Sequence, residues 1–214
     1  MASTNDLPAT ISINSTIEEI ERINARTMRR LYLYGEITSV DEDEVGFLNS
    51  SIVSQLIDDI LDCNRMDKDI EPEEREPVYL YINSPGGNMT EGFALISMME
   101  LSKTPIYTIN VGEWSSMSFL IGITGKKRLS LPNTTFLLHD GFSIAGGTTN
   151  KVQDRVDFEK KFENDVIKKH ILKHSKMKGI DYDALKRVEL YMLPEDALER
   201  GFIDEIVTDI DTIL

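Results

Sequence analysis

The sequence predicts an α/β fold built around a parallel sheet, and two features of its middle region carry this prediction. Apolar, β-branched runs alternate there with segments of helical spacing, between residues 78 and 138. Strands that alternate with helices in this way form parallel sheets with right-handed crossovers. The chain has 214 residues, which is enough for one sizeable core. We therefore expect an arm or leader with a short helix at 1–27 and a single domain at 28–214.

The amino-terminal half contains the first strands and helices in alternation. A polar segment at 1–14 is expected to be flexible or removable, and a helix begins near Ser15. The remaining predicted elements are strands at 31–37, 78–83 and 105–111, and helices at 47–61, 89–102 (with Thr90 as N-cap) and 115–123. The charged stretch 62–77 is poor in apolar residues and predicts an exposed loop.

The carboxyl-terminal half begins with two short strands hinged at Pro132-Asn133. A glycine-rich loop then leads into a long helix at about 148–177, and another short helix starts at Asp181. A further helix has Pro194 in its first turn and Gly201 after its end, and the final strand follows at 202–207. The long helix is too long to lie flush on such a core, so we expect it to project and pack against another subunit.

Composition limits the setting and the partners of the chain. The net charge of −14 argues against nucleic acid or an anionic membrane surface as a partner, because both need a basic face. The single cysteine, Cys63, excludes an internal disulfide and favours a reducing compartment. The first residues lack a signal-peptide pattern, and no apolar run approaches the roughly 20 residues of a membrane span. We expect a soluble, cytoplasmic protein.

The stretch "EWSSMSF", residues 113–119, contains three candidate nucleophiles. A serine hydroxyl needs a base that accepts its proton, a group that orients the base, and N–H donors for the oxyanion. Ser116 lies where a helix starts, so the N–H of Met117 could be one of the oxyanion donors. Ser115 and Ser118 are better interpreted as a cap and a small packing residue. Taken alone, the stretch is also consistent with a capped core helix.

A second turn, "NSPGGN" at 83–88, follows the preceding strand in the same way. Gly86 and Gly87 lack the side chain that would keep a substrate carbonyl away from the backbone. Because parallel strands end at one edge of a sheet, this turn and the serine stretch should lie close together. A plain strand-to-helix turn is the alternative.

The chain has three histidines, and they occur in two different contexts. His139 ends the apolar strand "TTFLLH" just before a loop, where a base would face a cleft; a buried core histidine is the alternative. His170 and His174 have the i, i+4 spacing of metal ligands, but the glutamate of an H-E-x-x-H motif and an evident third ligand are missing. We interpret this pair as surface histidines and predict no metal site.

Five fragments in order give the chain a family resemblance. They are "RRLYLYGEI", "YLYINSPGGNMTEG", "GEWSSMSF", "GKKRLSLPNTTFLLHDG" and "LPEDALERGFIDEI". Together they span about residues 29–207, and the chain resembles the ClpP family, the ring-forming serine peptidases that are the proteolytic subunits of Clp proteases. The resemblance implies a ClpP/crotonase-type spiral of ββα units, with the long helix at about 148–177 as a projecting handle.

The resemblance also implies roles for individual residues. Ser116 matches the nucleophile, His139 the base, and the backbone N–H groups of Gly87 and Met117 the oxyanion hole. Glu189 occupies the position at which the family has the aspartate of its triad, and a glutamate can also orient a histidine. An extended substrate is expected along 141–147, and the expected substrate-binding residues are Gly86, Gly141, Phe142 and Ser143.

The same resemblance implies an assembly of two stacked heptameric rings that encloses a chamber for unfolded polypeptides. Cofactors are not expected, because the sequence contains no metal motif and no nucleotide motif such as G-x-x-x-x-G-K-[ST]. ATP use would belong to a separate AAA+ unfoldase partner.

Three other readings stay open at this point. Glu189 and the "MSF" segment, one residue shorter than the family's usual run, are consistent with a ring subunit that cleaves poorly. A crotonase-type acyl-CoA enzyme would use the two backbone donors without Ser116 or His139. A Ser–Lys peptidase would take Lys126 or Lys127 as its base.

Overall fold

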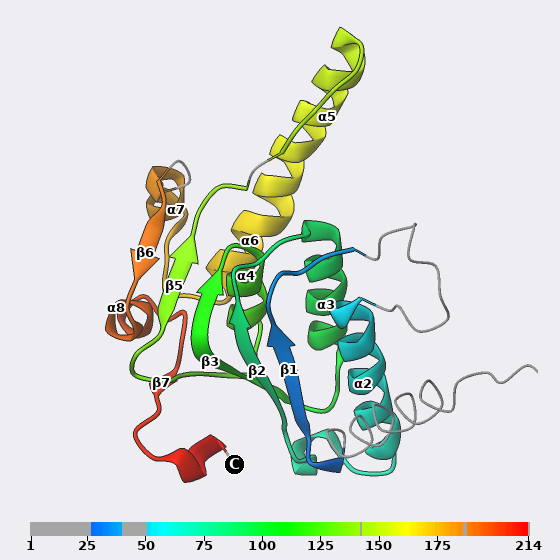
Figure 1. Cartoon of the computed structure of the whole chain (residues 1–214), viewed down its shortest axis with the longest axis vertical. Helices are drawn as coiled ribbons and strands as arrows, with labels where there is room; N and C mark the ends of the chain where they lie inside the picture. Colours follow the sequence, from blue (N-terminus) through cyan, green and yellow to red (C-terminus); the bar gives the residue numbers. More distant parts are fainter. Residues whose placement is uncertain (1–26, 40–50, 142, 186–187, 214) are drawn as a thin grey trace, which may run out of the picture.

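The computed structural model describes residues 27–39, 51–141, 143–185 and 188–213 (Figure 1). The helix expected near Ser15 and the first residues of the helix predicted at 47–61 lie outside these ranges.

The described chain forms one mixed sheet with helices packed around it (Figure 1). The strands are β1 (Arg30–Tyr34), β2 (Val78–Ser84), β3 (Ile106–Ser115), β4 (Lys127–Ser130), β5 (Thr135–Leu138), β6 (Leu190–Met192) and β7 (Glu205–Ile206). The helices are α2 (Ile52–Met66), α3 (Met89–Leu101), α4 (Met117–Ile123), α5 (Thr149–Phe162), α6 (Lys168–Lys173), α7 (Gly179–Leu185) and α8 (Pro194–Glu199). Short 3₁₀ turns occur at Pro72–Glu74 and Ile210–Ile213.

The parallel sheet predicted from the strand–helix alternation is confirmed. Strands β1, β2, β3, β4 and β7 pair in that order, each parallel to its neighbour. β3 divides its pairing, because its first half contacts β4 and its last residues contact β5. Strand β6, which runs antiparallel to β5, is not predicted by the sequence pattern. With only three residues, β6 is too short to show a strand pattern.

The core lies between the sheet and helices α2, α3 and α4. Every residue of α4 is buried, as its apolar sequence predicted. Trp114 and Phe136 meet edge to face across β3 and β5, with ring centroids 5.5 Å apart. This packing holds the carboxyl ends of β3 and β5 against each other.

The N-cap of helix α3 lies two residues before the predicted one. Asn88, and not Thr90, is the N-cap, and its Oδ1 accepts the N–H groups of Thr90 and Glu91 at 2.8 and 3.1 Å. Asparagine is among the best N-cap residues, so that Thr90 falls into the first turn. The glycine turn therefore passes into the helix without an intervening residue.

The prediction of an exposed loop at 62–77 is partly wrong. Helix α2 continues to Met66, and Asp67, which follows it, is buried. The Asp67 carboxylate accepts both terminal nitrogens of Arg29, at 2.5 and 3.0 Å, and the hydroxyl of Thr104 at 2.8 Å. The Arg29 hydrogen bonds are the main cause that lowers the pKa of Asp67. A charged residue is usually exposed, but the Asp67 carboxylate can be buried because Arg29 pairs with it.

The long helix projects beyond the carboxyl ends of β2, β3 and β5 (Figure 1). It consists of α5, a π-helical turn at Glu163–Ile167, and α6. None of the residues of α5 is buried, and Phe158 remains 59% exposed. The helix predicted at about 148–177 thus extends over 149–173.

Within the ranges described, no helix combines the length and the apolar composition that are needed to cross a bilayer.

Candidate active site

Four neighbouring strands align near one end of the sheet, and this alignment positions the predicted site. Ser84 pairs with Trp114, Trp114 with Phe136, and Phe136 with Met192, which makes one row across β2, β3, β5 and β6. The predicted site residues follow this row by two or three positions on each segment: Ser116, Gly87, Met117, His139 and, on the antiparallel strand, Glu189. Residues from distant parts of the sequence are therefore brought to the same edge.

Ser116 is the N-cap of α4 and has an unusual backbone conformation. Its φ and ψ are 55° and −121°, and Ser116 and Arg29 are the two non-glycine residues with positive φ in the described chain. L-residues rarely adopt such angles, which cost of order 1–3 kcal/mol and cluster at functional sites. The Ser116 side chain makes no capping hydrogen bond and is half-buried. A sharp turn between β3 and α4 thus presents this hydroxyl.

The two neighbouring serines have structural roles. The Ser118 hydroxyl is fully buried, lies 2.6 Å from the Ser84 carbonyl oxygen, and accepts the Ser115 N–H at 2.9 Å. It therefore joins the end of β2 to the end of β3. Ser115 was expected to cap the helix, but its hydroxyl donates to Glu113 at 2.9 Å instead. Ser115 is the last residue of β3, so that the helix starts one residue later than this expectation required.

The glycine turn packs directly on the backbone around Ser116. A Cβ atom placed on Gly86, whose φ is +94°, would lie 2.8 Å from both the Ser116 Cβ and the Met117 nitrogen. A Cβ atom on Gly87, with φ +138°, would lie 2.2 Å from the Ile37 carbonyl oxygen. Both positions therefore require glycine, for conformation and for space.

The N–H groups of Gly87 and Met117 are the two expected oxyanion donors. Ile37 bridges the glycine turn: its N–H donates to the Gly86 carbonyl at 2.8 Å, and its carbonyl accepts the Asn88 N–H at 2.7 Å. These two hydrogen bonds do not involve the Gly87 N–H. Met117 is the first residue of α4, and the N–H groups of the first helical turn have no partner within the helix. Neither N–H has an acceptor among the described residues. The role of Ile37 was not anticipated from the sequence.

Both backbone polar groups of Gly86 already form hydrogen bonds within the protein. Its carbonyl accepts Ile37, and its N–H donates to the Ser84 hydroxyl at 3.1 Å. Its contribution to the predicted substrate site is the space left by the missing side chain.

His139 directly follows β5 and is half-buried. Exposure alternates along β5, where Phe136 and Leu138 are buried and Thr135 is exposed. Continuing this alternation puts His139 on the more open face, together with Leu137. The main chain connects it to the serine turn, since the Ser116 N–H donates to the Leu137 carbonyl at 3.0 Å. Within the described residues, the imidazole forms no hydrogen bond.

Glu189 directly precedes strand β6. Leu138 pairs with Leu190, so that the next antiparallel position sets His139 opposite Glu189. The Glu189 carboxylate is exposed and accepts the Tyr191 hydroxyl at 2.9 Å, a hydrogen bond that raises the pKa of Tyr191. Burial is the main cause that raises the pKa of the Tyr182 phenol to about 12, and the charge of Asp140, the other acid near His139, adds to this shift.

The segment expected to bind substrate lies between β5 and α5. Gly141 and Ser143 are exposed, and the Ser143 hydroxyl donates to Glu159 of α5 at 2.9 Å. Phe142 lies outside the described residues. The described part of 143–147 has no strand partner, so its backbone edge is open to an added strand.

The lysines of the Ser–Lys alternative lie at the far end of the sheet. Lys127 pairs with Tyr107 at the start of β3, and the Lys126 N–H donates to the Ile106 carbonyl at 2.8 Å. Nine residues of strand separate Tyr107 from Ser116, on the order of 25–30 Å. This alternative is therefore wrong on geometry.

The remaining two histidines are not surface histidines, contrary to the sequence interpretation. His170 is buried, and only 15% of the His174 side chain is exposed. Burial is the main cause that lowers the pKa of both rings, to about 4 for His174. The i, i+4 pair faces α3 and α4, and this packing is not visible in a charged helical sequence.

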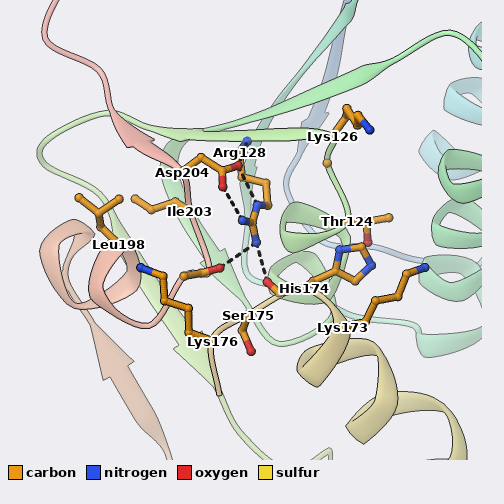
Figure 2. A pocket seen from close by; sticks show the side chains of 12 residues that line it. Thr124, Lys126, Arg128, Lys173, His174, Ser175, Lys176, Leu198, Ile203 and Asp204 are labelled. Carbon is orange, nitrogen blue, oxygen red and sulfur yellow. Dashed lines mark hydrogen bonds and ion pairs between the residues drawn. The ribbon is translucent and has the colours of Figure 1, made fainter. Parts of the chain in front are cut away.

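A polar pocket of about 520 Å³ lies beside these histidines, near the start of β4 (Figure 2). Arg128 dominates its wall: its guanidinium binds Asp204 through two nitrogens, at 2.9 and 2.5 Å, and donates to the carbonyls of His174 and Gly201. These contacts occupy Arg128 within the protein. The pocket is separate from the row that leads to Ser116.

Comparison with known proteins is consistent with this geometry. Residues 37–209 match the model of a family described as Clp protease. The chain is 30% identical over 206 residues to an ATP-dependent Clp protease proteolytic subunit of Streptococcus sanguinis, covering 94% of this chain and 96% of the relative. Proteins with the same description from Streptococcus gordonii and Streptococcus pneumoniae are each 28% identical, covering 95% of this chain and 97% of the relative. The α/β fold with a projecting helix is the one expected for this family.

Proposed function

The chain belongs to the Clp protease family, and we propose that it is the peptidase core of an ATP-dependent protease, a serine endopeptidase that hydrolyses unfolded polypeptides. The observation that carries the proposal is the row across β2, β3, β5 and β6. It directs a serine, a histidine, a carboxylate and two unpaired N–H groups to one edge, which are the parts that acyl transfer needs.

The reaction begins when His139 accepts the proton of Ser116 and the serine oxygen attacks the peptide carbonyl. The C–N bond then breaks, His139 donates the proton to the leaving amine, and an acyl ester remains on Ser116. Water, deprotonated by His139, attacks this ester and releases the carboxylic acid and the free serine. Proton transfer by such a base contributes typically 10²–10⁴-fold to the rate.

The oxyanion of each tetrahedral intermediate accepts the N–H groups of Gly87 and Met117. Both are backbone donors held by packing: Ile37 clamps the glycine turn, and Ser118 joins β2 to β3. Such donors need no reorganisation during the reaction, and the loss of one typically costs about 3–4 kcal/mol in the barrier.

Glu189 orients His139 and stabilises the imidazolium. This role requires the carboxylate to turn from Tyr191 toward His139, a rotation that its exposure to solvent permits. The substrate backbone would add as a strand along 141–147, the segment that contains the predicted substrate-binding residues.

The proposed assembly is two stacked heptameric rings that enclose the active sites, with an AAA+ unfoldase as the partner that consumes ATP. The projecting helix is the proposed contact between the rings. In support of this, Phe158 is exposed on α5, a helix with no buried residue. The proposed setting is the cytoplasm, which agrees with a chain that has one cysteine. No cofactor takes part in the proposed reaction.

The test is covalent labelling of the assembled protein with a fluorophosphonate, read by intact mass. We expect one label per chain in the wild type, none in Ser116→Ala, and full labelling in Ser115→Ala, the matched serine outside the turn. Native mass should be about fourteen times the 24.3 kDa chain. An assembled wild type that takes no label would favour a structural ring subunit. Unchanged peptide hydrolysis in Ser116→Ala would exclude the serine mechanism.

A further inference from the structure

Three side chains from two helices converge beside the pocket of Figure 2. Glu100 is contributed by α3, while His170 and His174 lie one turn apart at the end of α6. One ligand atom from each residue lies within 4.8 Å of the other two. Glu100 Oε1 is 3.9 Å from His170 Nδ1 and 3.4 Å from His174 Nε2.

These separations are close to those of a coordination sphere. Zinc binds imidazole nitrogen and carboxylate oxygen at about 2.0–2.2 Å, which sets tetrahedral ligand atoms about 3.3 Å apart. Small side-chain rotations bridge the difference. Two histidines with one acidic residue are a ligand set that zinc uses in proteins.

The protonation pattern of His170 directs a lone pair into the cluster. Its Nε2 lies 3.1 Å from the Leu120 carbonyl oxygen and 3.2 Å from the Thr124 hydroxyl, both at the end of α4. A carbonyl only accepts, so Nε2 carries the proton and Nδ1 is left as an acceptor facing Glu100. Metal-bound histidines are oriented in this way, with the second ring N–H donated to a backbone carbonyl or a carboxylate.

A lysine is the competitor for the same carboxylate. The Lys173 ammonium donates to Glu100 Oε1 at 2.7 Å. The Lys173 side chain is 61% exposed, so it can turn into solvent at little cost. A divalent cation would replace one ammonium by a stronger charge on that oxygen.

We propose that Glu100, His170 and His174 bind a divalent transition metal of the zinc class. The metal would join α6, at the base of the projecting helix, to α3, and through His170 to α4. The three protein ligands leave one position for water. Three of the surrounding residues, Thr124, Lys173 and His174, also line the polar pocket, which gives an ion a route to the site (Figure 2). This inference does not depend on the proposed peptidase function.

The alternative is that Lys173, Glu100 and His174 form a hydrogen-bond network only. Only the metal site predicts saturable binding of Zn²⁺, so the first measurement is a calorimetric titration. Untagged full-length protein would be treated with a chelator, dialysed, and titrated with Zn²⁺. We expect one Zn²⁺ per chain, and Co²⁺ in place of Zn²⁺ should show the visible absorption of a four-coordinate site.

Variants assign the binding to these residues. Glu100→Gln keeps the shape of a partly exposed side chain and His174→Asn removes one imidazole; each should weaken Zn²⁺ binding more than about 100-fold, beyond the 10–100-fold typical of losing an outer-shell partner. Lys173→Gln removes the competing ammonium and should bind at least as tightly as the wild type. His139→Gln, which removes the remaining histidine, should bind like the wild type.

Melting temperatures measured with and without Zn²⁺ distinguish a variant that has lost the metal site from one that folds poorly. Zn²⁺ should raise the melting temperature of the wild type and leave that of Glu100→Gln unchanged, at equal protein concentration. Absence of a stoichiometric Zn²⁺ site in the wild type would overturn the proposal and establish the hydrogen-bond network. Wild-type affinity in both Glu100→Gln and His174→Asn would overturn it as well.

Discussion

Two histidine–carboxylate clusters in this molecule are assembled in different ways. His139 directly follows β5 and Glu189 directly precedes β6, so the antiparallel pairing of these strands leads to both residues, yet the carboxylate is exposed and bound to Tyr191. His170 and His174 lie on a helix packed against α3, and their ring nitrogens already converge on Glu100. Strand register aligns the backbone of the first cluster, whereas helix packing positions the side chains of the second.

The difference matches two kinds of chemistry. A base in acyl transfer must exchange its proton with serine, leaving group and water, so an imidazole without competing partners is suited to the task. A metal ligand must hold its lone pair in one direction, which the Leu120 carbonyl achieves for His170. The first two predictions below test the first of these clusters, and the others test ion pairs outside both.

The largest expected effect is that of removing the His139 imidazole. His139→Ala should lower kcat for hydrolysis of an unfolded protein or a peptide by about 10⁴–10⁶-fold, because Ser116 loses its base. The rate is measured on assembled protein. The side chain is half-buried and has no hydrogen bond in the described chain, so the melting temperature should change little.

Asp140→Asn is the control for this variant, because it removes the acid next to His139 in sequence. Successive side chains of an extended chain point to opposite sides, so Asp140 is not expected to contact the imidazole, and kcat should stay within about twofold of the wild type. A large loss in Asp140→Asn would instead show that this acid, and not Glu189, orients the base.

The second effect concerns the carboxylate opposite His139. Glu189→Gln keeps the side-chain shape but removes the charge, and should lower kcat about 10³–10⁴-fold if Glu189 sets the imidazole tautomer. Tyr191→Phe removes the phenol that binds Glu189, and should retain or increase the rate. Equal rates in the wild type and Glu189→Gln would show that the His139 base works without this acid.

Much of the fold was predictable because its signals are local. The strands at 78–83 and 105–111, the buried helix after the serine stretch, and the helix start at Pro194 all follow from apolar periodicity and cap residues. Ser116 and the glycine turn could be proposed as site residues, because two consecutive strands end in turns with small residues and the family resemblance gives both turns a role. Their close approach then follows from parallel strand pairing.

What could not be predicted depends on contacts between distant segments. Strand β6 has only three residues, and it becomes a strand through its pairing with β5. Ile37 clamps the glycine turn from a position about fifty residues away in the sequence. Glu100 is seventy residues from His170, so a search for metal motifs by local spacing finds two ligands and misses the third.

The third prediction tests a buried ion pair that lies outside both clusters. The Asp67 side chain is 2% exposed and binds Arg29 through two hydrogen bonds. Among the described residues, Asp67→Asn leaves Arg29 with only the distant, exposed carboxylate of Glu76, 3.8 Å from its Nε, and should lower the free energy of unfolding by about 3 kcal/mol. Asp69→Asn, at a neighbouring side chain that is 89% exposed, should change it by less than about 0.5 kcal/mol. Urea unfolding at one protein concentration measures both.

The same pair gives stability a defined pH dependence. Arg29 holds the pKa of Asp67 below its ordinary value, so the unfolded chain binds a proton at this carboxyl at a higher pH than the folded chain. The stabilisation is therefore complete above the unfolded pKa of about 3.9 and is lost as the pH falls through the lower folded pKa. Asp67→Asn should show a flatter loss of stability with acid than the wild type. Identical acid slopes would assign the acid sensitivity to other carboxylates.

The smallest expected effect is that of Lys127, at the end of the sheet away from Ser116. Its ammonium binds Glu205 at 2.9 Å, but the two side chains are 37% and 42% exposed, and pairs of this kind contribute about 0–1 kcal/mol. The Glu205 hydrogen bond raises the pKa of Lys127, which opposes the neutral amine that a base must provide. Lys127→Gln should therefore leave kcat unchanged and lower the free energy of unfolding by less than about 1 kcal/mol. If Lys127→Gln lost hydrolysis while His139→Ala retained it, the base would lie at this end of the sheet, and the row that leads to Ser116 would be a structural feature without a catalytic histidine.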